Sequence, residues 1–160
     1  MKTLQLAAAG TVVAMLLVNS APAVENAGPG PTPKDKCPVC GMFVSKYPDW
    51  AASVTFHDGS KAWFDGAKDL FKFLADPGHF LPGRGIADVR KVIVTDYYSL
   101  RPVDAKDAFF VVGSNVFGPM GLELVSFAKR SEADDFMRDH DGKRLLRFGD
   151  VNRAVLDGLE

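Results

Sequence analysis

The chain has 160 residues, of which 47% are hydrophobic, and its acidic and basic residues nearly cancel to a formal net charge of −1. This length suggests one domain or two small ones, and the hydrophobic content is sufficient for a packed core. The balanced charge offers no basic face, which argues against nucleic acid as a partner.

The N-terminus is typical of an export signal. Lys2 supplies the positive charge, residues 4–18 form an apolar run, and Ala21-Pro22-Ala23 has the form of a cleavage site. The run is shorter than the ~20 residues that span a bilayer, and no cysteine that could carry a lipid directly follows it. We therefore expect residues 1–23 to be a signal peptide and the mature protein to work in the periplasm, which is an oxidising compartment.

A linker is predicted next, because residues 24–36 contain a Pro- and Gly-rich run that stays extended. Apolar alternation, an Asp58-Gly59 hairpin signal and an apolar face then predict two strands, a helix and a third strand. Asp65 is placed to cap the helix. The expected elements are strands at 50–57 and 61–64, a helix over 66–74 and a strand at 89–95.

The second half repeats this order, with Ser131 opening a sequence that resembles a capping box. Phe64 and Phe127 each end a hairpin just before a helix, which indicates a duplicated unit. We expect an α+β fold of two ββαβ repeats, 37–97 and 98–160, with antiparallel sheet and helices packed on one side. The later elements are strands at 108–113, 122–127 and 143–148, and helices over 131–140 and 151–159.

One stretch, Cys37-Pro38-Val39-Cys40-Gly41-Met42, holds both cysteines of the chain and a methionine. Thiolate and thioether sulfurs are soft ligands, which select Cu(I), Zn(II) or iron–sulfur centres over hard cations. Met120 also adjoins glycines in a loop, whereas Met137 lies on an amphipathic helix and is expected in the core. The pattern favours a Cu(I) site, with Cys37, Cys40, Met42 and Met120 as candidate ligands.

Three other uses of the cysteine pair stay open. The pair could form a disulfide, or half of a zinc site completed by carboxylates or by histidine (His57, His79, His140). It could also serve a thiol–disulfide oxidoreductase, although such pairs begin a helix and none is evident after Cys40. Neither a pair of catalytic carboxylates nor a Ser/His/Asp order stands out, so an enzyme is not expected.

The chain resembles the NosL family over about residues 35 to 150. The resemblance lies in the run from Cys37 to Val44, in the segment from Phe64 to Phe71, and in Gly118-Pro119-Met120-Gly121. It implies a periplasmic copper-binding protein that carries Cu(I) to nitrous oxide reductase or another exported copper enzyme, with membrane-associated maturation proteins as further partners. It also implies Cys40, Met42 and Met120 as ligands, with Cys37 as an extra thiolate.

Overall fold

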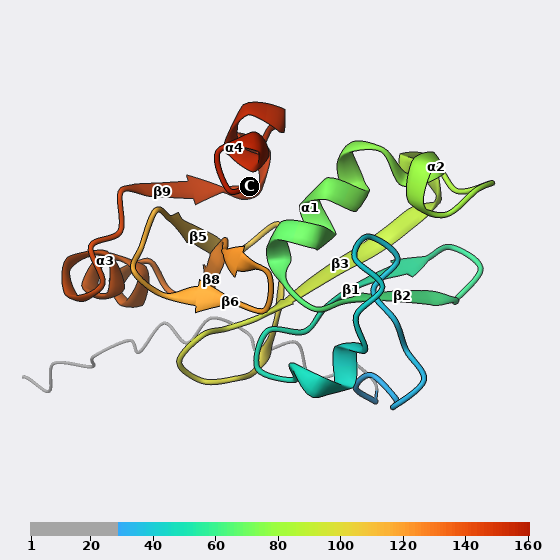
Figure 1. The fold of residues 1–160 in the computed structure, drawn as a ribbon, viewed down its shortest axis with the longest axis horizontal. Coiled ribbons are helices and arrows are strands. Elements are labelled where there is room, and N and C mark those ends of the chain that lie inside the picture. Colours follow the sequence, from blue (N-terminus) through green and yellow to red (C-terminus); the bar gives the residue numbers. More distant parts are fainter. Residues whose placement is uncertain (1–28) are drawn as a thin grey trace, which may run out of the picture.

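The computed structural model describes residues 29–160 (Figure 1). The predicted signal peptide, 1–23, and residues 24–28 of the predicted linker lie outside the described residues. Within residues 29–160, no helix has the length and apolar character needed to cross a membrane.

The first half forms a four-stranded antiparallel sheet in the order β2-β1-β3-β4. Gly59 has a φ of +86°, in the left-handed region that the predicted hairpin turn requires. Strand β4 lies between the strands predicted at 89–95 and 108–113 and was not itself predicted. The elements are β1 (Ala52–Phe56), β2 (Lys61–Phe64), α1 (Ala67–Ala75), α2 (Pro77–Phe80), β3 (Val89–Thr95) and β4 (Pro102–Asp104), with 3-10 turns at Val44–Lys46 and Ile86–Asp88.

The second half forms a three-stranded antiparallel sheet in the order β8-β5-β9, and a small β6–β7 hairpin separates β5 from β8. In each half the first strand lies between the second strand and the strand that follows the helix, which is compatible with the predicted duplication. The elements are β5 (Phe109–Val112), β6 (Phe117–Gly118), β7 (Gly121–Leu122), β8 (Val125–Phe127), α3 (Arg130–Asp139), β9 (Arg144–Arg147) and α4 (Arg153–Asp157), with a 3-10 turn at Phe148–Asp150. The α+β class with antiparallel sheets is confirmed; the unit boundaries remain a prediction.

Helix α1 lies where the two halves meet (Figure 1). Its Phe73 ring packs 5.1 Å from that of Phe64 on β2, and its Phe71 ring packs 5.1 Å from that of Phe110 on β5. One hydrophobic core therefore spans both sheets. A second, smaller cluster around Phe136 fills the space under α3. Because α1 is covered from both sides, even its polar residues Lys68 and Asp69 are buried.

Two predicted helix caps are wrong. The N-cap of α1 is Gly66 in extended conformation, and the Glu123 carboxylate, not that of Asp65, accepts an amide hydrogen of the first turn, so Asp65 does not cap the helix. The N-cap of α3 is Lys129, which leaves Ser131 inside the helix rather than at its start. Asp65 is thereby free to turn its carboxylate toward the cysteine loop.

Candidate metal centre

The cysteine motif forms a tight loop. Lys36 and Phe43 pair as an isolated antiparallel bridge, and the Cys37 amide donates to the Met42 carbonyl oxygen at 2.9 Å. The Gly41 amide donates back to the Cys37 carbonyl oxygen at 2.8 Å, and Gly41 has a φ of +78°. A residue with a side chain adopts that φ at a cost, so glycine suits the point where the loop reverses. The loop brings Cys37 and Cys40 to the same side.

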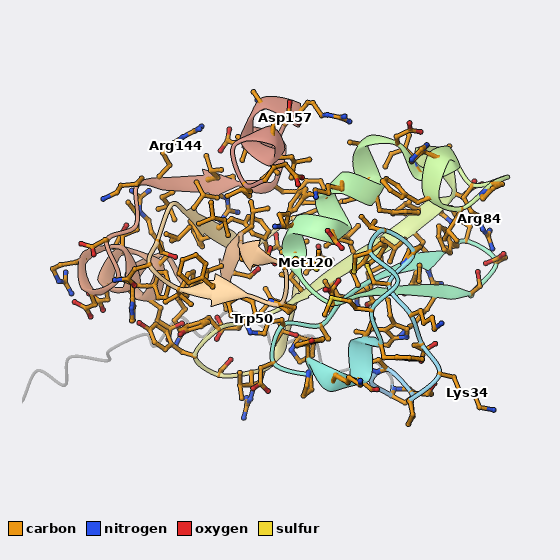
Figure 2. All side chains as sticks on the ribbon, in the orientation of Figure 1. Lys34, Trp50, Arg84, Met120, Arg144 and Asp157 are labelled. Carbon is orange, nitrogen blue, oxygen red and sulfur yellow. The ribbon has the colours of Figure 1, made fainter. Side chains whose placement is uncertain are left out.

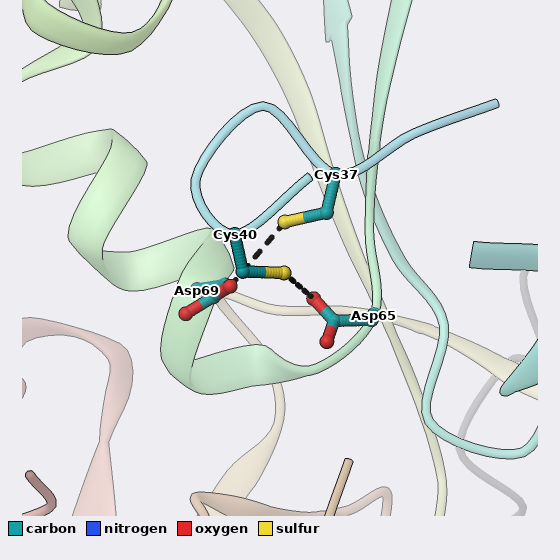
Figure 3. A group of neighbouring side chains, drawn as sticks. All are labelled: Cys37, Cys40, Asp65 and Asp69. Carbon is teal, nitrogen blue, oxygen red and sulfur yellow. Dashed lines mark hydrogen bonds between the residues drawn. The ribbon is translucent and has the colours of Figure 1, made fainter. Parts of the chain in front are cut away.

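Four donor groups meet where this loop touches the first turn of α1 (Figure 3). Sulfur or carboxylate oxygen atoms of Cys37, Cys40, Asp65 and Asp69 all lie within 4.8 Å of one another. The thiol of Cys37 donates to Asp69 Oδ2 at 3.3 Å, and the thiol of Cys40 donates to Asp65 Oδ1 at 3.3 Å. Both cysteines are free, so the disulfide alternative does not describe this structure.

The electrostatics of the pair argue against redox catalysis. Burial raises the pKa of the Cys40 thiol to about 12, and burial with the negative charge of Asp69 raises the pKa of the Cys37 thiol further. A reactive redox thiol needs a lowered pKa instead. The backbone amides of Cys40 and Val39 oppose the rise in the pKa of Cys37, and that of Met42 opposes the rise in the pKa of Cys40, so they favour the thiolate form of each cysteine.

The two aspartates are buried as deeply as the Cys37 side chain, which is 1% exposed. Burial also raises the pKa of Asp69, and the thiols beside it oppose that rise. Asp65 Oδ2 is buried without a hydrogen-bond partner within the described part of the chain. Buried polar atoms are nearly always partnered, so such an atom in a cluster of donors indicates a position that a cation can fill.

The structure treats the two predicted methionine ligands differently. Met42 is half-buried and belongs to the cysteine loop itself. Met120 is 44% exposed at the turn of the β6–β7 hairpin, and its carbonyl oxygen accepts the Lys68 ammonium at 2.8 Å. Figure 2 places Met120 at the junction of the two halves, beside α1. Met42 is thus part of the cysteine loop and Met120 is tied to α1 through its main chain, and coordination of a metal by their thioethers is part of the proposal below.

The histidines take no part in the donor group that residues 29–160 provide. His57 and His79 are exposed, and His140 lies at the C-terminal end of α3 as predicted, with its ring 4.5 Å from that of Phe136. Met137 packs partly buried against the cluster under α3, which confirms its predicted core role.

The sequence-based prediction missed Asp65 and Asp69 as members of the site. One signal was present: two carboxylates stand four residues apart at a helix start. This signal was missed because Asp65 was interpreted as a helix cap.

Comparison with known proteins identifies the family. A family model described as NosL matches residues 30–156. This chain belongs to the NosL family. The curated copper-binding lipoprotein NosL of Stutzerimonas stutzeri is 29% identical over 123 residues, which cover 76% of this chain and 64% of the relative. The chain thus spans slightly less than two thirds of the length of that protein.

A solved NosL structure agrees with the fold. The crystal structure of the copper chaperone NosL from Shewanella denitrificans superposes with a TM-score of 0.68 and 28% sequence identity, covering 79% of this chain and 96% of that one. These NosL relatives are described by copper binding or copper delivery rather than by catalysis, which agrees with the prediction that the chain is not an enzyme.

Proposed function

We propose that this protein is an exported Cu(I) chaperone that delivers copper for assembly of the metal centres of nitrous oxide reductase or another exported copper enzyme. Membrane-associated maturation proteins are its expected partners in the periplasm. The observation that carries the proposal is the pair of free thiols on one loop, within 4.8 Å of each other and of two buried carboxylates, in a member of the NosL family.

Cys37 and Cys40 are the proposed thiolate ligands, and Met42 and Met120 are the proposed thioether ligands. Cu(I) prefers such soft donors and is satisfied by two or three of them. The carboxylates of Asp65 and Asp69 are hard donors. In this proposal they accept the hydrogen bonds of the two thiols until copper displaces the thiol protons. Copper is the cargo, so the site must bind it tightly and still admit a ligand from the acceptor.

Anaerobic competition against a colorimetric Cu(I) chelator tests this function. Cys40→Ala should abolish tight binding. Met42→Leu and Met120→Leu, which remove sulfur at nearly constant volume, should each weaken binding by about tenfold, or about 1.4 kcal/mol. Met137→Leu is the matched control, because that methionine packs under α3 and should leave affinity unchanged. Unchanged affinity in Cys40→Ala would refute the proposal.

A divalent cation at the same place is the second candidate, because two thiolates and two carboxylates also make a tetrahedral Zn(II) set. The same variants separate the two ions. Met42→Leu and Met120→Leu should spare Zn(II) affinity, whereas Asp65→Asn should lower it by about 10-fold or more. The divalent site would be favoured if the protein bound Zn(II) more tightly than Cu(I) and if neither methionine substitution changed the affinity for Cu(I).

A further inference from the structure

Lys68 is a buried lysine whose position calls for an explanation. Its side chain is 3% exposed, although lysines are almost never so buried unless they are paired. Its ammonium group donates to two main-chain carbonyl oxygens, that of Met120 at 2.8 Å and that of Leu159 at 3.2 Å. One side chain of α1 thus holds the β6–β7 turn and the C-terminal end of the chain.

The same residue is tied to the hairpin a second time. The Lys68 amide donates to Glu123 Oε1 at 2.5 Å, and the Leu124 amide donates to that oxygen at 2.9 Å. Glu123 follows the hairpin and is 3% exposed. Its side chain passes between Gly66, just before α1, and Gly118 on β6.

These two glycines leave room for the Glu123 side chain. A Cβ at Gly118 would lie 2.9 Å from Glu123 Cγ, and a Cβ at Gly66 would overlap the Glu123 carboxylate. The glycine before the helix and the glycine of the Pro-Met turn therefore serve the same contact, although they come from different halves of the chain.

Little else fixes Met120. The β6–β7 hairpin pairs only two residues of each strand, and a lone two-stranded hairpin is marginally stable. The Met120 side chain is 44% exposed, so burial does not hold it in place. The bond from Lys68 reaches the main chain of Met120 itself, and Lys68 lies between Asp65 and Asp69 in the sequence.

We propose that Lys68 is a positioning residue for copper binding, which holds the main chain of Met120 at the first turn of α1 and so presents its thioether to the Cys37–Cys40 loop. Glu123 supports the same hairpin from its other end. This inference rests on the proposed function and adds a role for a residue that cannot itself bind the metal as an ammonium.

A double-mutant cycle on the full mature chain tests the role. Lys68→Leu keeps an aliphatic side chain, removes the donors and adds no sulfur. Loss of such a supporting contact typically lowers metal affinity by about 10- to 100-fold, and we expect a fall of that size for Cu(I). Met120→Leu combined with Lys68→Leu should bind no more weakly than Met120→Leu alone. X-ray absorption of bound Cu(I) should show one sulfur neighbour fewer in each single variant. Lys129→Leu, on an exposed ion pair, is the matched control and should bind as the wild type does.

The outcomes separate this inference from the proposed function. A wild-type chain without tight Cu(I) binding refutes the function itself. Tight wild-type binding that Lys68→Leu leaves unchanged, or losses that add in the double variant, overturns only the role of Lys68. If Lys68→Leu does not fold by circular dichroism, Gly118→Ala replaces it, because the added methyl group pushes the hairpin away from Glu123. The same non-additivity with Met120→Leu is expected, and additive losses overturn the inference.

Discussion

Replacing Glu123 with glutamine should change how the stability of the metal-free protein depends on pH. Burial raises the pKa of Glu123 from 4.5 to about 7. The amides of Leu124 and Lys68 and the charge of Lys68 oppose that rise, while the charge of Asp69 adds to it. The folded protein therefore keeps the Glu123 proton over a pH range in which the unfolded chain has lost it.

The size of the effect follows from the two pKa values. Below pH 4.5 both states are protonated, and above about pH 7 both are ionised. Between these limits the unfolded chain binds fewer protons, so the contribution of Glu123 to stability is lost as pH rises. One pKa unit corresponds to about 1.4 kcal/mol, which makes the total loss about 3 kcal/mol. Glutamine does not titrate and loses nothing over this range.

Urea unfolding followed by tryptophan fluorescence, from about pH 4 to pH 8, measures this. The stability of Glu123→Gln relative to the wild type should rise by about 3 kcal/mol across the range, most steeply between pH 4.5 and about 7. Glu132→Gln is the control, because Glu132 pairs with Lys129 at the surface and should show a much smaller change. A constant difference between Glu123→Gln and the wild type at all pH values would refute the reasoning.

Two further results are expected. Phe71→Ala should lower the free energy of unfolding by about 3–5 kcal/mol, because the Phe71 ring joins α1 to Phe110. Phe117→Ala, at an exposed position, should lower it by less than about 1 kcal/mol. Urea denaturation compares the two variants, and equal losses would contradict the shared core. Anaerobic alkylation read by mass spectrometry should modify Cys40 before Cys37, since Cys37 is 1% exposed and Cys40 is half-buried; the opposite order would contradict the loop geometry.

The long elements could be predicted from sequence because their signals are local. β2 and β3 have the predicted bounds, since alternation and an apolar run specify each strand without help from the rest of the chain. β4, β6 and β7 are only two or three residues long. Such short strands have no periodicity to detect. Each pairs with the strand next to it in the chain, β4 with β3 and β6 with β7, and Lys68 and Glu123 tie the β6–β7 region to α1.

The site was predictable only in part, for a related reason. Cys37 and Cys40 stand close together in the sequence, so their spacing was enough to predict them as site residues. Asp65 and Asp69 join them only because α1 packs between two sheets and turns its first turn toward the loop. Burial of a charged residue on a short helix depends on tertiary packing, so neither the hydrophobic pattern nor capping preferences predict it.

On the proposed function, the unequal exposure of the proposed ligands would give copper transfer a direction. Cys37 is 1% exposed, whereas Cys40 is half-buried and Met120 is 44% exposed. A ligand from the acceptor would reach the more exposed Met120 and Cys40 before it reaches Cys37. A neutral thioether is the weakest of these ligands, so it yields first, and Cys40 follows. Cys37 keeps hold of the ion until the acceptor has enough ligands in place, which lets copper move without being set free.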